Sequence, residues 1–120
     1  MKKVLIADDC PKLVELVRVT LEREDCEIIY ASDGEETLRK ARKEQPDVIL
    51  LDIMMPKMDG FEVCRQLRKD PQTKEIPIIM LTAKGQEVDR EKGRELGANE
   101  YITKPFSPST LLAKIKEILA

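Results

Sequence analysis

The chain of 120 residues is 42% hydrophobic and 37% charged, the length and balance of one compact domain with a buried core. Its 21 basic and 23 acidic side chains give a net charge of -2, so the surface has no general positive field for nucleic acid. No apolar run approaches the roughly 20 residues that cross a bilayer, and the opening MKKVLIADD turns acidic too early for a signal peptide. Composition therefore predicts one domain, residues 1–120, that binds neither membrane nor nucleic acid directly.

Histidine is absent from the sequence, and the cysteines have no paired spacing. The lack of histidine excludes Ser–His and Cys–His nucleophile pairs, histidine metal sites and histidine phosphodonors. Cys10, Cys26 and Cys64 are odd in number and form no CxxC motif, which favours reduced thiols and a cytoplasmic location. Any chemistry must therefore use carboxylates, hydroxyls, lysines or a hard metal ion.

Five short apolar runs predict strands. Most are continuously apolar rather than alternating, which is typical of strands covered on both faces in a parallel sheet. The runs are Val4–Ala7, Ile28–Ala31, Val48–Leu51, Ile78–Leu81 and Glu100–Ile102.

Amphipathic stretches separate these runs and predict helices. Pro11 suits the first turn of the first helix, and Ser32 with Glu35 fits a capping box for the second. Gly60 is expected in the turn that opens the third helix, where a positive φ is cheap for glycine. Ser107 precedes a proline and serves as the expected N-cap of the last helix.

The stretch Gly85–Leu96 has the weakest helical signal of the five. It contains Gly93, and an interior glycine costs about 1 kcal/mol relative to alanine. This fourth helix is therefore expected to be the loosest element.

Alternating strands and helices fill the whole chain and leave no linker for a second domain. Crossover helices between strands favour parallel pairing with right-handed connections. We therefore expect an α/β fold, a doubly wound (βα)5 sandwich around a five-stranded parallel sheet.

Polar side chains follow four of the five strands. Asp8 and Asp9 end the first strand, Asp52 the third and Thr82 the fourth, and the fifth runs into Lys104. Each alone has an ordinary explanation as a helix cap, a strand-end residue or a solvated loop charge. In open α/β sheets, however, the carboxyl ends of parallel strands share one edge, and three carboxylates crowded there repel one another unless a cation offsets them.

Two cations suit this predicted cluster. Lys104 supplies one, and the remaining negative charge suits Mg²⁺, which accepts one or two carboxylates together with waters and phosphate oxygens. Asp52 beside such an ion can attack phosphorus to give an acyl phosphate. Lys104 and Thr82 would then contact the transferring oxygens.

The segments VLIADD, VILLDIMMPKMDG, PIIMLTAKG and YITKPF, in this order, resemble the receiver domain of two-component response regulators. The resemblance covers essentially the full chain, which in this respect is similar to single-domain chemotaxis response regulators. It implies a flavodoxin-like fold with strand order 2-1-3-4-5, and a phosphoacceptor signalling domain rather than an enzyme.

The resemblance also implies roles for individual residues. Asp52 matches the phosphorylated aspartate, Asp9 the direct metal ligand and Asp8 the ligand that acts through water. The backbone carbonyl ligand falls on Met54. Lys104 matches a phosphate-contacting residue and is expected to form a cis peptide bond with the following proline.

The remaining implied roles concern switching and partners. Thr82 and Tyr101 match the pair that changes position on activation and alters the surface of the fourth helix, fifth strand and fifth helix. A histidine kinase or histidine phosphotransfer protein would donate the phosphoryl group, and a downstream protein would read the surface. Met54 and Lys84 match positions that modulate phosphoryl lifetime, and Cys10 is expected to be either a packing residue or a bystander. The methionines of MMPKM form either a partner surface or packing contacts.

Three alternatives stay open. A magnesium-dependent aspartyl-phosphate hydrolase would need a second aspartate where Met54 stands, and a flavodoxin-like flavin carrier would need a glycine-rich phosphate loop where Asp8 and Asp9 stand. The third is a receiver fragment of a larger regulator, since Met1 suggests a beginning but an output domain can follow Ala120.

Overall fold

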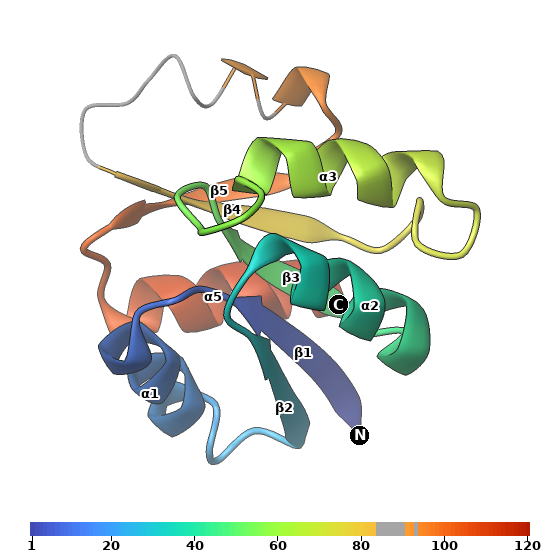
Figure 1. Cartoon of the computed structure of the whole chain (residues 1–120). Helices are drawn as coiled ribbons and strands as arrows, with labels where there is room; N and C mark the ends of the chain where they lie inside the picture. The colour runs from blue at the N-terminus through green and yellow to red at the C-terminus, as the bar shows by residue number, and fades with distance from the viewer. Residues whose placement is uncertain (84–90, 93) are drawn as a thin grey trace.

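Five parallel strands form one sheet in the order β2-β1-β3-β4-β5 (Figure 1). The computed structural model describes residues 1–83, 91–92 and 94–120. The strands are β1 (Lys2–Ala7), β2 (Cys26–Ala31), β3 (Val48–Asp52), β4 (Ile78–Ala83) and β5 (Glu100–Lys104). Every predicted strand is present, and the doubly wound α/β fold with order 2-1-3-4-5 is confirmed.

Helices cover both faces of this sheet. The described helices are α1 (Pro11–Thr20), α2 (Gly34–Glu44), α3 (Gly60–Lys69) and α5 (Pro108–Leu119). The helices α1 and α5 lie on one face, and α2 and α3 lie on the other (Figure 1). The predicted fourth helix, Gly85–Leu96, lies largely outside the described residues, as does Lys84. No described helix has the length and apolar composition needed to cross a membrane.

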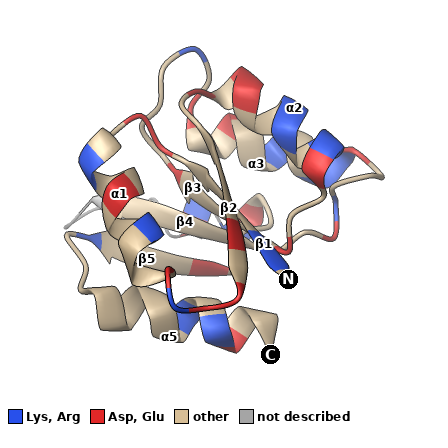
Figure 2. Cartoon of the chain, turned by 90° about the horizontal axis from the view of Figure 1, so that it is seen from below, with Lys and Arg blue, Asp and Glu red and all other residues tan. Residues whose placement is uncertain are grey.

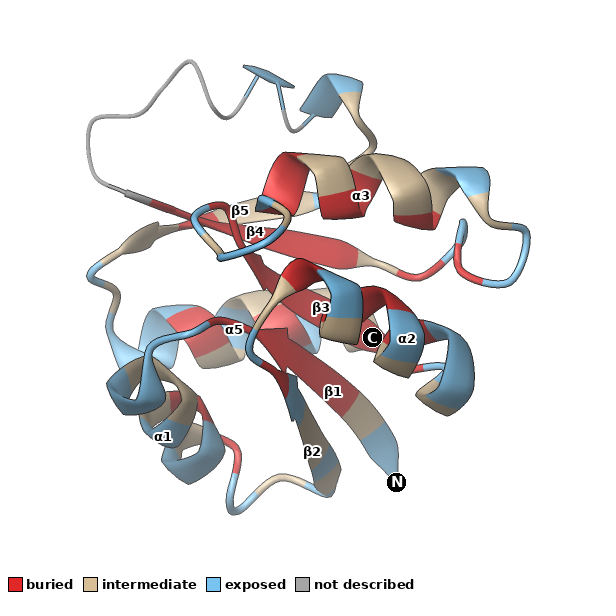
Figure 3. Ribbon diagram, viewed as in Figure 1, coloured by how far each residue is buried: buried red, intermediate tan, exposed pale blue. Residues whose placement is uncertain are grey.

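Alternation along the central strands divides the core into two clusters, one on each face. In β1, Leu5 and Ala7 pack toward α2 and α3, whereas Val4 and Ile6 pack toward α1 and α5. All five residues of β3 are buried, as a central strand with covered faces requires (Figure 3). The continuous apolar runs of the sequence therefore reflect burial on both sides.

The predicted capping box of α2 is wrong by one residue. Asp33, not Ser32, is the N-cap, and its side chain accepts a hydrogen bond from Glu36 N at 2.8 Å. The Glu36 carboxylate in turn accepts from Ser32 N at 2.7 Å. Acidic residues in the first turn and basic residues in the last complement the helix dipole, and both signs of charge are visible along α2 in Figure 2.

The expected positive φ at Gly60 is also wrong, because Gly97 is the described glycine with that conformation. Gly60 is required by a close approach instead. A Cβ atom there would lie 2.4 Å from the backbone oxygen of Asp52, so only glycine lets α3 begin against the end of β3.

Two of the three loop methionines pack inward. Met55 and Met58 lie against the core cluster beneath α2 and α3, whereas Met54 is 69% exposed. Packing is therefore the role of Met55 and Met58, as one of the two interpretations expected.

Candidate functional site

The polar residues predicted to converge do so at the carboxyl edge of the sheet. Asp8 directly follows β1, Asp52 and Lys104 are the last residues of β3 and β5, and Thr82 lies near the end of β4. Because these strands are parallel, their ends bring residues nearly a hundred positions apart into contact.

Three carboxylates form the centre of the site. One oxygen each from Asp8, Asp9 and Asp52 can be chosen so that all lie within 4.8 Å of one another. Asp8 is only 1% exposed and Asp52 only 5%, whereas Asp9 is exposed to solvent. Two of the three charges are thus removed from water and held together.

Lys104 offsets part of this charge. Its Nζ lies 2.9 Å from Asp8 Oδ2 and 3.2 Å from Asp52 Oδ1, so one ammonium group bridges the two buried carboxylates. The Lys104 side chain is 28% exposed, which excludes the alternative of a freely solvated loop charge. The peptide bond from Lys104 to Pro105 is cis, as expected.

The electrostatic environment of the site shifts the pKa values of Asp52 and Lys104. Burial and the charge of Asp8 raise the pKa of Asp52, against the opposing effects of Lys104 and of Met54 N, which donates to Asp52 Oδ1 at 3.3 Å. Burial alone would lower the pKa of Lys104, but the hydrogen bond to Asp8 and the charge of Asp52 raise it. Three carboxylates against one described ammonium leave excess negative charge, which matches a divalent cation with oxygen ligands.

Helix capping does not explain the acidic pair. The N-cap of α1 is Cys10, and it makes no side-chain capping bond. Asp8 instead accepts a hydrogen bond from Cys10 N at 2.9 Å, which turns the chain out of β1 and orients the carboxylate. The three cysteines are all free thiols.

Thr82 is 1% exposed at the same edge of the sheet. Within the described part of the chain, its Oγ1 is the buried side-chain polar atom that has no hydrogen-bond partner. A buried hydroxyl in this condition is costly to folding and marks a position where a ligand oxygen can supply the missing bond.

Tyr101 lies outside the carboxylate group. It sits in β5, three residues before Lys104 and in register with Met80, and its side chain packs against the margin of the core beneath α2 and α3. Strand alternation puts it on the same face of β5 as Thr103, which pairs in register with Thr82.

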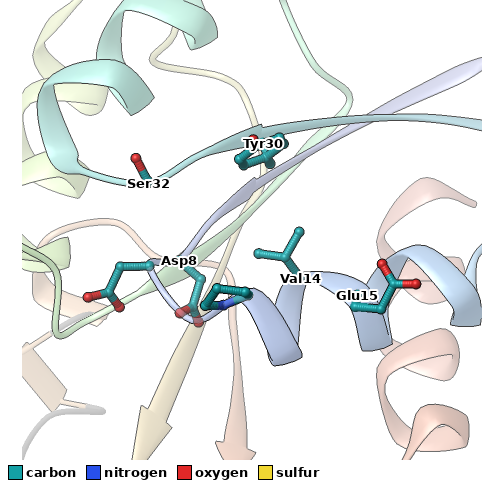
Figure 4. A pocket seen from close by; sticks show the side chains of 7 residues that line it. Asp8, Val14, Glu15, Tyr30 and Ser32 are labelled. Atoms are coloured by element: carbon teal, nitrogen blue, oxygen red, sulfur yellow. The ribbon is translucent and has the colours of Figure 1, made fainter.

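A pocket of about 240 Å³ opens beside the acidic pair (Figure 4). Val14 and Glu15 of α1 form one side, and Tyr30 and Ser32 at the end of β2 form the other. Asp8 lies at its border, so there is room for solvent and ligand atoms next to the buried carboxylates.

Sequence reasoning missed two contributors to the geometry of this edge. Lys57, in the loop after β3, lies 3.5 Å from Asp33 Oδ2 and 3.9 Å from Glu35 Oε2. Gly34, between those two acids, packs tightly against Met58 of the same loop. The contact of Gly34 with a loop more than twenty residues away has no signal in the local sequence and needed coordinates.

The fold and this charged edge are those of a receiver domain, and the comparisons agree. The family model for the response regulator receiver domain matches residues 4–116, so the chain belongs to the receiver domain family of two-component response regulators. This membership decides against the hydrolase and flavin-carrier alternatives.

Curated relatives are transcriptional regulators of about twice the length. The chain is 53% identical over 118 residues to the alkaline phosphatase synthesis transcriptional regulatory protein PhoP of Bacillus subtilis, covering 98% of this chain and 48% of that protein. It is 47% identical over 117 residues to the transcriptional regulatory protein ResD of the same organism, covering 98% and 48%. The chain therefore spans about half the length of the curated relatives it matches.

Solved structures agree closely with the fold. A response regulator from Chloroflexus aurantiacus superposes with a TM-score of 0.93 at 38% identity, covering 98% of this chain and 97% of that one. The chemotaxis protein CheY4 of Vibrio cholerae gives 0.92 at 39% identity, covering 99% of both chains. The receiver domain of sensor histidine kinase PA1611 from Pseudomonas aeruginosa, solved with a magnesium ion in its active-site cleft, gives 0.89 at 28% identity, covering 98% of this chain and 97% of that one.

Proposed function

We propose that Asp52 accepts a phosphoryl group from a phosphohistidine donor in a magnesium-dependent reaction. The observation that carries this proposal is the convergence of Asp8, Asp9 and Asp52 on one edge with Lys104 bridging two of them. Residues 1–120 would act as one receiver domain that assists its own phosphorylation and dephosphorylation.

The residues present fit Mg²⁺, because carboxylate oxygens gathered within 4.8 Å and carrying excess negative charge are the donor set of a hard divalent ion. Asp9 and Asp52 would bind it directly, Asp8 through water, and Met54 through its backbone carbonyl. When bound, the ion supplies positive charge opposite the phosphoryl oxygens.

The transfer itself is a substitution at phosphorus. A carboxylate oxygen of Asp52 forms a bond to phosphorus while the bond from phosphorus to the donor imidazole nitrogen breaks, and the electron pair leaves with that nitrogen. The product is an aspartyl phosphate. Lys104 keeps Asp52 ionised beforehand and contacts the transferred oxygens afterwards, so catalysis here is positioning and charge compensation.

Phosphorylation would then change the interaction surface. The group adds a charge of about -1.5 to -2 near Thr82, whose hydroxyl has no hydrogen-bond partner among the described residues and moves to bond the phosphoryl group. Tyr101 turns into the space that Thr82 leaves, and the surface of β5, α5 and the expected fourth helix changes. A histidine kinase or phosphotransfer protein would be the donor, and a downstream protein the reader.

Nucleic-acid binding has to be considered for the longer relatives. RpaA of Synechocystis, 44% identical over 119 residues and covering 99% of this chain and 49% of that one, carries the description DNA-binding dual master transcriptional regulator. The expectation of no nucleic-acid binding rests only on the balanced charge of these 120 residues. If these residues are the receiver part of a longer cytoplasmic regulator, we assign DNA binding to a separate output domain of that regulator.

Intact mass measurement tests the proposal. Incubation with Mg²⁺ and acetyl phosphate should add one phosphoryl group to the wild type and none to Asp52→Asn. Asp59→Asn is the matched control: Asp59 caps α3 by accepting from Glu62 N at 2.9 Å, and asparagine keeps that cap. A phosphoryl group on Asp52→Asn, or none on the wild type, would overturn the proposal.

A further inference from the structure

The loop between β3 and α3, residues 53–59, contains a strained turn. Met58 N donates a hydrogen bond to Pro56 O at 2.8 Å, and Lys57 between them has a φ of 69°. A hydrogen bond between residues i and i+2 around a positive φ is the rare, strained form of the γ-turn. Such a conformation persists only where surrounding contacts hold it.

The same loop is joined to the phosphoacceptor. Gly60 N donates to Ile53 O at 2.8 Å and closes the base of the loop beside the end of β3. Met54 N donates to Asp52 Oδ1, so a shift of the loop moves a hydrogen bond to the reacting carboxylate. It would also move the Met54 carbonyl that is proposed as a metal ligand.

The first turn of α2 supports the strained turn by direct packing. Helices α2 and α3 both begin at the carboxyl edge of the sheet (Figure 1). A Cβ atom at Gly34 would lie 2.5 Å from Met58 Cβ and 2.7 Å from Met58 O, closer than such atoms approach. Gly34 is buried, and its φ is not positive, so the contact and not the backbone conformation requires glycine.

Charge supports the turn from the solvent side. The Lys57 ammonium lies within 4 Å of carboxylate oxygens of Asp33 and Glu35, the neighbours of Gly34. Asp33 is fixed in turn as the N-cap of α2. The strained residue is therefore tied to the rigid start of a helix.

We propose that Asp33, Gly34 and Glu35 form a seat that positions the β3–α3 loop, so that Asp52 and the Met54 carbonyl meet the metal in the productive geometry. This inference rests on the proposed function and makes Gly34 and Lys57 positioning residues of that site. Neither touches the phosphoryl group.

The test is the dissociation constant for Mg²⁺, measured by calorimetry on the full chain. Gly34→Ala should raise it by at least about tenfold, the usual effect of losing a group that orients metal ligands. Gly97→Ala is the matched control, because that glycine also faces a tight contact, with Arg68 at 2.9 Å, and has a φ of 99°. It should lose stability but keep the wild-type constant for Mg²⁺.

Lys57→Gln is the second variant, since it removes the charge without adding volume in the core. It should weaken Mg²⁺ binding in the same direction as Gly34→Ala but less, while Lys57→Arg restores binding. Lys43→Gln, an exposed lysine in the last turn of α2, is its control and should leave binding unchanged.

Wild-type Mg²⁺ affinity in both a folded Gly34→Ala and Lys57→Gln would overturn the seat while leaving the proposed function intact. If Gly34→Ala does not fold, wild-type affinity in Lys57→Gln alone overturns it. Absence of Mg²⁺ binding in the wild type would instead overturn the proposed function.

Discussion

The two edges of the sheet each hold a half-buried cation, and the two cations have different kinds of partner. At the carboxyl edge, Lys104 contacts the buried carboxylates of Asp8 and Asp52. At the amino edge, the acceptors of Arg68 among the described residues are neutral oxygens that precede β4 and β5. The carboxyl edge carries excess negative charge, whereas at the amino edge the donors of Arg68 are matched by hydrogen-bond acceptors.

At the amino edge, Arg68 is the centre of a hydrogen-bond network in which its donors have acceptors. The Arg68 guanidinium donates to the backbone oxygens of Gly97, Lys74 and Ile76 at 2.9, 3.0 and 2.7 Å, and to Asn99 Oδ1 at 2.8 Å. Asn99 Oδ1 also accepts from the first residue of β4. Burial lowers the pKa of Arg68, yet its donors are matched by acceptors in the two segments that precede β4 and β5.

The carboxyl edge, by comparison, has unbalanced charge and an unsatisfied hydroxyl among the described residues. Its carboxylates outnumber the described ammonium group, and the buried Thr82 hydroxyl has no partner among the described residues. Stability alone would favour completing both edges. Neutral acceptors therefore complete the hydrogen bonds of Arg68 at the amino edge, whereas the carboxyl edge keeps negative charge available for a cation and a phosphoryl group.

The largest effect on stability is expected from loss of Arg68 at the amino edge. Arg68→Met should lower the free energy of unfolding by about 3 kcal/mol, because it removes a charged donor from four acceptors, one of them the carbonyl oxygen of buried Ile76. Urea unfolding measures this, with the exposed Arg39→Met as control. Mg²⁺ affinity should stay at its wild-type value, and a large change in it would break the separation of the two edges.

Loss of Lys104 should be smaller and should depend on Mg²⁺. Lys104→Met leaves two buried carboxylates facing each other, which destabilises the metal-free protein by about 2 kcal/mol. Added Mg²⁺ should recover much of this loss, and phosphorylation should be impaired although the metal still binds. A destabilisation that Mg²⁺ leaves unchanged would show that Lys104 acts as an ordinary structural cation.

The smallest effect has the opposite sign. Asp52→Asn should stabilise the metal-free protein by about 1 kcal/mol, because a buried like charge is removed. The folded pKa of Asp52 is raised above the ordinary 3.8, so its contribution is fully present below that value and is lost as pH rises through the folded pKa. The advantage of Asp52→Asn should therefore grow across that window and then level off, as unfolding midpoints over a pH series will show. A pH-independent difference would contradict the raised pKa.

Sequence patterns predicted the fold and the membership of the site for a definable reason. Apolar runs mark strands covered on both faces, and parallel strands bring their ends to one edge, so the convergence of Asp8, Asp52 and Lys104 follows from topology. The Arg68 network and the Gly34 contact escaped, because they depend on distances between segments that no local pattern encodes. Gly60 shows the same limit. The sequence placed this glycine at the start of the third helix, but the reason that glycine is required, the close approach of the Asp52 backbone oxygen, needed coordinates.

Thermal unfolding at increasing Mg²⁺ concentrations tests the claim that the carboxylates of Asp8, Asp9 and Asp52 form one divalent cation site. The wild type should gain about 2.7 kcal/mol at a Mg²⁺ concentration one hundred times the dissociation constant. Asp9→Asn should lose most of that gain, whereas Asp25→Asn, an exposed aspartate at the amino edge, should keep it. Equal magnesium stabilisation of the wild type and Asp9→Asn would contradict the claim.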